Sequence, residues 1–164
     1  MVEANLIVTY SPTHSESAQK EIMGILKEFG EKAKVLKLEE GIAEVTVSNA
    51  RAIVKSLAKV DKKKFSYTYN WIPIDNWCKS VAAEIQKIVK KVSAGIGDAE
   101  KWKMDLSLHK SKESGRDLIM KLTAVIEKKK VDLNNPEKII KVMVVGEKTA
   151  ISLLNKDEIF SITK

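Results

Sequence analysis

The 164-residue sequence has one cysteine, two histidines and no long apolar run. Cys78 cannot close an internal disulfide, and His14 and His109 are too few for the usual zinc ligand sets. No stretch of about 18 uncharged apolar residues is present, and the N-terminus lacks the basic and then apolar pattern of a secretory signal. These absences predict a cytoplasmic protein that uses no metal, needs no cofactor and does not bind membranes.

Glycine is also scarce, with seven residues in the whole chain. Gly95 and Gly97 in "SAGIGDAE" are the nearest approach to a phosphate-binding loop. The third glycine of the dinucleotide pattern and the lysine of the P-loop are both missing. We interpret the segment as an ordinary loop.

Charge, by contrast, is abundant and unevenly placed. Residues 1–60 contain eight Lys/Arg and eight Asp/Glu, whereas residues 61–164 contain 21 and 14, so the whole formal excess of +7 lies in the later part. A basic excess confined to one part of a chain favours a polyanionic partner for that part. A positive surface that serves solubility alone is the simpler alternative.

The first part alternates strand-like and helix-like segments. Strands are predicted at 5–11, 32–40 and 42–48, and helices at 15–30 and 49–60. Thr13 and Glu16 have the spacing of a capping box, and Gly30 is placed to end the first helix. The pattern predicts a small α+β sandwich with its helices on one face of a sheet.

A second part follows the lysine run "DKKKF". A helix is predicted from about Asn76 to Val92, with Asp75 as its cap. Apolar and polar residues alternate strictly in "KWKMDLSLHK". In a strand this places Trp102 and its even-numbered neighbours on a core face, and Lys103 and its odd-numbered neighbours on a solvent-exposed face. A helix around Leu118 and Leu122, carrying Lys128–Lys130 at its end, and strands at 138–146 and 149–154 complete the pattern.

The segment "VDLNNPE" between the last helix and the next strand has turn chemistry. Pro136 donates no backbone hydrogen bond, and Asp132 can accept hydrogen bonds from nearby amides. We expect Val131 and Leu133 to anchor the turn to the core. A catalytic carboxylate is the alternative, but it would need a second titratable group, and the sequence identifies none.

The order of these segments resembles a known family. "VDLNNPEKIIKV", preceded by the alternating strand and a helix and followed by "ISLL", is similar to the C-terminal half of a THUMP domain, and "WIPID" resembles its start. The first 60 or so residues resemble the ferredoxin-like domain that commonly precedes it. The resemblance implies an α+β chain, with a ferredoxin-like domain over residues 1–66 and a THUMP domain of α/β type with a mixed sheet over residues 67–164.

The resemblance also implies a function. THUMP domains bind RNA in tRNA-modifying systems and usually share a chain with a methyltransferase, a thiouridine synthetase or a deaminase. About ten residues follow "ISLL", too few for such a unit. We therefore expect a non-catalytic adaptor that presents tRNA to a separate enzyme, most simply the cytidine N4-acetyltransferase. The alternative is the RNA-recognition subunit of a thiolating or methylating enzyme.

Basic residues around the alternating strand are the candidate RNA contacts. Side chains on one strand face repeat at two-residue spacing and can reach successive phosphates, which supply most nonspecific affinity for RNA. His109 could stack on a base or contact a phosphate, or be an ordinary exposed strand end. The candidates are Lys101, Lys103, His109, Lys110, Lys112, Arg116 and Lys121.

A stand-alone RNA-processing enzyme is the remaining alternative. Asp105, Ser107 and His109 lie on one face of the predicted strand and contain the residue types of a hydrolytic triad. Triad members must be aimed at one another, whereas alternate residues of one strand point the same way. We therefore expect no catalytic residue in this set.

Overall fold

The computed structural model describes residues 3–111 and 114–162 and divides the chain into two compact units. Residues 1–74 and 157–164 form the first unit, and residues 75–156 form the second. The domain boundary between residues 66 and 67, which the resemblance to the THUMP family implies, stays a prediction. In the structure the segment 68–73 belongs to the sheet of the first unit, because it pairs with the N-terminal strand.

The first unit has the ferredoxin-like order of strands and helices. Its elements are β1 (Leu6–Tyr10), α1 (Ser15–Glu28), β2 (Lys34–Glu39), β3 (Ile42–Thr46), α2 (Ala50–Ser56) and β4 (Thr68–Pro73), with short 3-10 turns at Pro12–His14, Leu57–Lys59 and Lys62–Lys64. The antiparallel sheet runs β2-β3-β1-β4, and the last short strand, β9 (Phe160–Ser161), pairs with β4 at one edge. The α+β class and the ferredoxin-like half are confirmed.

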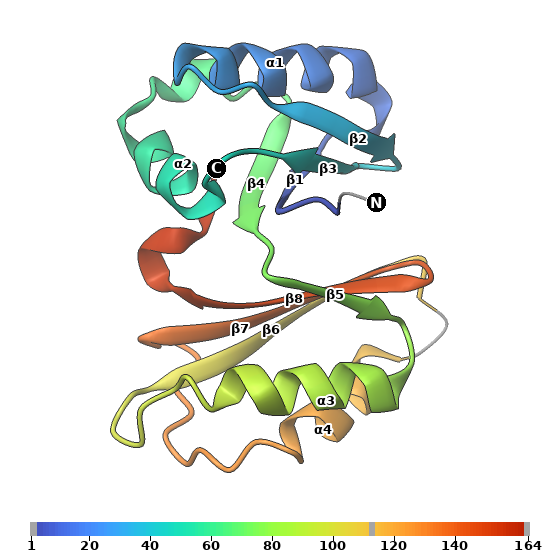
Figure 1. Cartoon of the computed structure of the whole chain (residues 1–164), viewed down its shortest axis with the longest axis vertical. Coiled ribbons are helices and arrows are strands. Elements are labelled where there is room, and N and C mark those ends of the chain that lie inside the picture. Colours follow the sequence, from blue (N-terminus) through green and yellow to red (C-terminus); the bar gives the residue numbers. More distant parts are fainter. Residues whose placement is uncertain (1–2, 112–113, 163–164) are drawn as a thin grey trace. The chain divides into compact units, whose positions relative to one another are not determined.

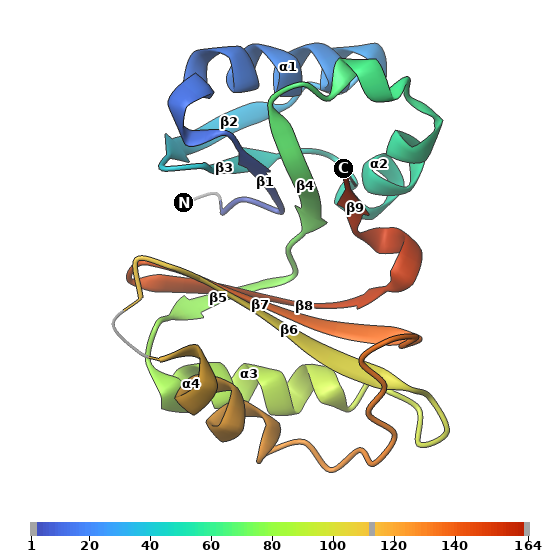
Figure 2. The same cartoon turned by 180° about the vertical axis from the view of Figure 1, so that it is seen from behind.

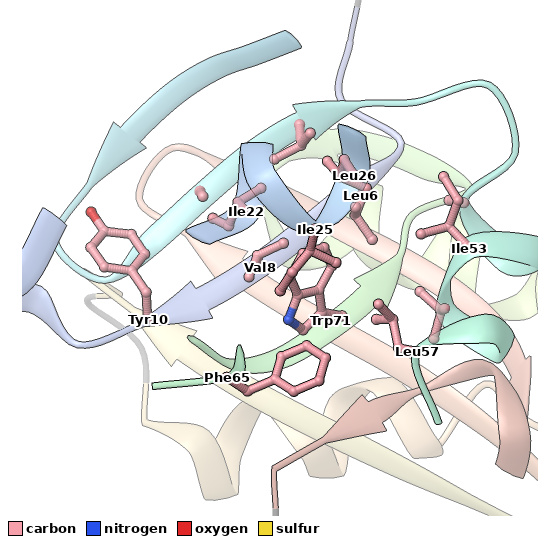
Figure 3. Close-up of a cluster of buried hydrophobic side chains, with 14 of the residues drawn as sticks. Leu6, Val8, Tyr10, Ile22, Ile25, Leu26, Ile53, Leu57, Phe65 and Trp71 are labelled. Carbon is pink, nitrogen blue, oxygen red and sulfur yellow. The ribbon is translucent and has the colours of Figure 1, made fainter. Parts of the chain in front are cut away.

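Both helices of this unit cover one face of its sheet (Figure 1). Alternate residues of β1, namely Leu6, Val8 and Tyr10, point toward α1 and are buried. Trp71 of β4 is fully buried at the centre of the cluster and stands edge-on to Phe65 (Figure 3). The apolar spacing seen in the sequence therefore forms one continuous core.

The predicted end of α1 is confirmed, whereas its predicted N-terminal cap is not. Gly30 has a φ of 72° and does end α1, as expected from its freedom to adopt the left-handed conformation. The capping box is wrong. His14 is the N-cap residue of α1 without a side-chain cap bond, and the Thr13 hydroxyl lies 3.1 Å from His14 Nδ1 instead.

The second unit is a mixed four-stranded sheet with two helices. Its elements are β5 (Asn76–Lys79), α3 (Ala82–Ser93), β6 (Trp102–His109), α4 (Gly115–Thr123), β7 (Lys138–Val145) and β8 (Lys148–Asn155), followed by a 3-10 turn at Lys156–Glu158. The sheet order is β5-β8-β7-β6, with β6 and β7 parallel and the other neighbours antiparallel. The predicted mixed sheet is confirmed, and α3 and α4 cover the same face of it (Figure 2).

Three predictions about the helices of this unit are wrong. The segment 76–79 is the strand β5, because it pairs with β8 in the register Asn76↔Ile151, and α3 begins only at Ala82. Asp75 does not cap a helix, since the N-cap residue of α3 is Val81; the backbone N–H of Asp75 donates to the hydroxyl of Ser152. At the other helix, α4 ends at Thr123, so Lys128–Lys130 lie beyond it and do not complement its terminus.

Candidate nucleic-acid interface

The basic excess of the protein belongs to the second unit. Its residues 75–156 include 17 Lys/Arg and 11 Asp/Glu, whereas the first unit has 12 and 11. A polyanion is therefore attracted mainly by the second unit.

Strand β6 lies at an edge of the second sheet and has the two faces that its sequence predicts. Trp102 and Met104 are buried, and Leu106 and Leu108 pack against the same core beneath α3 and α4. The opposite, helix-free face carries Lys103, Asp105, Ser107 and His109, each partly exposed. We call these four side chains the β6 polar face.

The candidate RNA contacts fall into separate places. Lys103 and His109 share the β6 polar face, whereas Arg116 and Lys121 lie on α4, in the helix layer on the other side of the sheet. Lys101 precedes β6 and Lys110 follows it, with a left-handed φ of 56°. Lys112 lies outside the described residues. The structure thus brings two candidates onto one face, and their contact with RNA stays a prediction.

The candidate lysines differ in how far acidic neighbours neutralise them. Lys101 Nζ lies 3.7 Å from a carboxylate oxygen of Asp132. Within residues 3–111 and 114–162, no ion pair involves Lys103 or Arg116. These two cations are therefore the ones most available to phosphates.

One charged residue that we did not select from the sequence lies beside the β6 polar face. Lys141 is in the middle of β7, opposite Asp105 in the parallel register, and is only 6% exposed. Its ammonium donates to Ser107 Oγ at 2.9 Å and lies 3.1 Å from Asp105 Oδ2. The signal in the sequence is a lysine inside the apolar strand "KIIKVMVVG", where a charge needs partners.

His109 ends β6 next to this cluster. Burial lowers the pKa of the imidazole below its ordinary value of 6.5, and the charge of Lys141 lowers it further. The backbone carbonyl of His109 accepts a hydrogen bond of 2.8 Å from Gly146, which fixes the strand end. His109 is therefore a neutral hydrogen-bonding ring near pH 7.

The segment 131–137 is a turn, as predicted. Asp132 Oδ1 accepts hydrogen bonds from the amides of Asn134 at 3.0 Å and Asn135 at 2.9 Å. The expectation that Val131 and Leu133 anchor the turn is wrong, since they are 55% and 69% exposed. The turn is held by polar bonds to Asp132 and by the bridge of Val131 to Trp102, so its side chains need no core contact.

Neither a metal-binding cluster nor a membrane-spanning helix is found in the described part of the chain. No cluster of three or more His, Cys, Asp or Glu side chains there is arranged to hold a metal ion. No helix among those residues is both long enough and apolar enough to cross a bilayer.

Comparison with known proteins identifies relatives through the fold. No protein-family model and no curated protein matches the chain. Among solved structures, PH1313 from Pyrococcus horikoshii Ot3 matches 96% of this chain and 55% of its own, with a TM-score of 0.65 and 14% identity. TrmN from Thermus thermophilus matches 90% of this chain and 44% of its own, with a TM-score of 0.58 and 12% identity.

A third match is a 4-thiouridine synthetase solved as an RNA complex with bound ATP. It covers 98% of this chain and 42% of its own, with a TM-score of 0.52 and 16% identity. The chain thus spans about half the length of the proteins it matches. At these identities the likeness concerns the fold, and it supports the THUMP-like arrangement that the sequence resemblance implied.

Proposed function

We propose that this protein binds tRNA through the basic second unit and presents it to a separate modifying enzyme. The observation that carries the proposal is the likeness over 98% of the chain to a 4-thiouridine synthetase solved with RNA. The concentration of the basic excess in residues 75–156 supports it independently. The cytidine N4-acetyltransferase is the favoured enzyme, on the sequence resemblance alone.

Binding would depend chiefly on backbone phosphates. Lys103 on β6 and Arg116 on α4 are cations without an ion-pair partner among the described residues, and Lys110 lies between them in the chain. Lysine and arginine release counterions when they neutralise phosphates, which makes affinity fall with salt. Recognition of shape and backbone is common for paired regions of RNA.

We further propose that the protein forms and breaks no covalent bond in the RNA. Lys141 donates to Ser107 and pairs with Asp105, and among the described residues no hydrogen bond joins Asp105 to His109 or His109 to Ser107. An ammonium that is paired with a carboxylate is a donor and cannot accept the proton of a nucleophile. Asp105, Ser107 and His109 are therefore not arranged as a hydrolytic triad.

The first unit has nearly balanced charge, with 12 basic and 11 acidic residues. We assign it to orienting the protein or docking to the enzyme, because it attracts RNA less strongly than the second unit.

A second candidate function is the RNA-recognition subunit of a thiolating or methylating enzyme. The likeness to a 4-thiouridine synthetase favours it as directly as it favours an acetylation adaptor. Co-purification from the source organism separates the two, since the enzyme recovered with the protein and tRNA identifies the modification.

Replacement of basic side chains tests RNA binding directly. The triple variant Lys103→Ala, Lys110→Ala, Arg116→Ala should bind tRNA about tenfold more weakly or worse. A matched control, Lys20→Ala, Lys27→Ala, Lys32→Ala, removes three exposed lysines from the first unit and should change affinity far less. Equal losses in the two triple variants, with both folded, would contradict RNA binding by the second unit.

A further inference from the structure

The most unusual charged group in the second unit is the nearly buried Lys141. Its side chain is 8% exposed, whereas the side chain of Asp105, its ion-pair partner, is 45% exposed. Burial of an ion pair costs desolvation, and apolar residues of similar size often replace such a pair without loss of stability. A purely structural role therefore gives no strong reason for a lysine at this position.

The contacts of Lys141 determine what Ser107 can do. A lysine ammonium has three donors and no acceptor, so in their 2.9 Å bond the oxygen of Ser107 must be the acceptor. The hydroxyl hydrogen of Ser107 cannot then point at Lys141, and it remains available to an acceptor in front of the β6 polar face. A hydroxyl that accepts from an ammonium is also a stronger donor, because hydrogen bonds in a chain polarise one another.

The same ammonium controls the charge of the β6 polar face. Asp105 lies between Lys103 and Ser107 on this face, and an unpaired carboxylate there would repel a phosphate. Lys141, 3.1 Å from its Oδ2, compensates that charge from the neighbouring strand β7. His109, two residues beyond Ser107 on the same face, adds a ring N–H as a second donor.

We infer that Lys141 is a positioning residue for a phosphate-binding subsite whose donors are Ser107 and His109. The ligand is one phosphodiester of the RNA, so the inference rests on the proposed function and specifies where one phosphate binds. Lys141 does not touch the phosphate. It directs the hydroxyl of Ser107 outward and offsets the charge of Asp105.

Five variants and one control test this assignment by tRNA affinity at low salt. Ser107→Ala should weaken binding about three- to tenfold, the effect of one ordinary hydrogen bond lost. Lys141→Met should weaken it about tenfold or more, because the hydroxyl loses its direction and Asp105 becomes unpaired. Asp105→Asn should strengthen binding, and adding it to Lys141→Met should restore part of the loss.

The control is Lys138→Met in the same strand. Lys138 is also partly buried and paired, 2.5 Å from Asn155 Oδ1 and 3.8 Å from Glu100, but it lies on the other face of β7. Its loss removes the same charge and should weaken binding about twofold or less. Urea denaturation of every variant shows whether a loss of affinity follows from unfolding.

The double variant Ser107→Ala, Lys141→Met provides the sharpest comparison. If Lys141 acts partly through Ser107, the double variant should weaken binding by less than the product of the two single losses, because the shared part of the effect is lost only once. Equal weakening by Lys138→Met and Lys141→Met, or unchanged binding by the folded Ser107→Ala protein, would overturn the inference and leave the proposed function intact. Absence of tRNA binding by the unaltered protein would refute the proposed function, and this subsite with it.

Discussion

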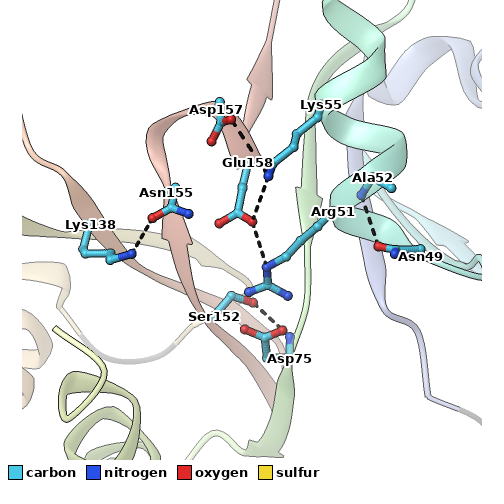
Figure 4. Close-up of polar contacts among 10 residues, drawn as sticks. All are labelled: Asn49, Arg51, Ala52, Lys55, Asp75, Lys138, Ser152, Asn155, Asp157 and Glu158. Atoms are coloured by element: carbon cyan, nitrogen blue, oxygen red, sulfur yellow. Dashed lines mark hydrogen bonds and ion pairs between the residues drawn. The ribbon is translucent and has the colours of Figure 1, made fainter.

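Arg51 Nε lies 3.2 Å from Glu158 Oε2 and joins α2 to the turn that precedes β9 (Figure 4). The Glu158 side chain is 8% exposed, and Lys55 Nζ lies 3.9 Å from the same carboxylate oxygen. Beyond this turn, Phe160 packs against Phe65 with ring centroids 4.9 Å apart. The C-terminal segment is therefore an integral part of the first unit.

Arg51→Met should destabilise the first unit by about 2 kcal/mol, because it leaves the buried Glu158 with a weaker cationic neighbour. The matched control is Lys37→Met, which breaks an exposed pair with Glu39 and should cost less than about 1 kcal/mol. Urea denaturation of the two variants measures the difference. Similar costs would show that the Arg51–Glu158 pair adds no more than a surface pair.

Truncation of two leucines of the second unit should change stability by very different amounts. Leu133 is 69% exposed, so Leu133→Ala should change stability by less than about 0.5 kcal/mol. Leu122 is fully buried, so Leu122→Ala should cost about 2 to 5 kcal/mol. Thermal unfolding of both variants tests whether the turn lacks a core anchor, and a large loss for Leu133→Ala would mean that the turn is anchored after all.

The turn at Asp132 should depend on pH. Hydrogen bonds from the Asn135 and Asn134 amides, and then the charge of Lys101, lower the pKa of Asp132 below 3.8. Because the folded pKa is the lower one, the carboxylate contributes stability above pH 3.8, and this is lost as pH falls through the folded value.

Asp132→Asn keeps an acceptor oxygen for the turn but has no charge to lose, whereas Asp132→Ala loses the acceptor at every pH. Hydrogen exchange at the Asn134 and Asn135 amides should therefore be faster in the alanine variant. Equal exchange rates in the alanine variant and the unaltered protein would exclude Asp132 as the residue that holds this turn.

His109 should titrate below an ordinary histidine, and Lys141 should be part of the reason. Lys141→Met should raise the pKa of His109 without restoring it fully, because burial is the larger cause of the shift. Because the pKa of His109 is lower in the folded state, the unfolded state binds the proton first as pH falls below 6.5. The contribution of His109 to the free energy of unfolding therefore declines between pH 6.5 and the folded pKa. NMR titration of the imidazole measures the shift directly, and an unchanged pKa in the variant would remove Lys141 as a cause.

Much of the fold followed from local patterns in the sequence. Strict alternation from Trp102 to His109 identified both faces of β6, and Gly30 identified the end of α1, because these features act within a few residues. The strand β5 was missed because it depends on pairing with β8, about 70 residues away, and that pairing overrides a local preference for helix.

The candidate interface was less accessible to sequence reasoning. Lys141 stood inside an apolar strand, but its partners Asp105 and Ser107 become neighbours only through the parallel pairing of β6 and β7. That Arg116 and Lys103 lie in different layers of the second unit could not be predicted from the sequence either, since it depends on the face to which α4 packs.

The salt dependence of tRNA binding tests the central claim most directly. Affinity of the unaltered protein for a tRNA transcript is measured between about 50 and 200 mM salt. If about four phosphates are neutralised, log affinity should fall against log salt with a slope of about −3, and the Lys103, Lys110, Arg116 alanine variant should have a shallower slope. A flat response, or the same slope in that variant, would contradict recognition of the RNA backbone by these residues.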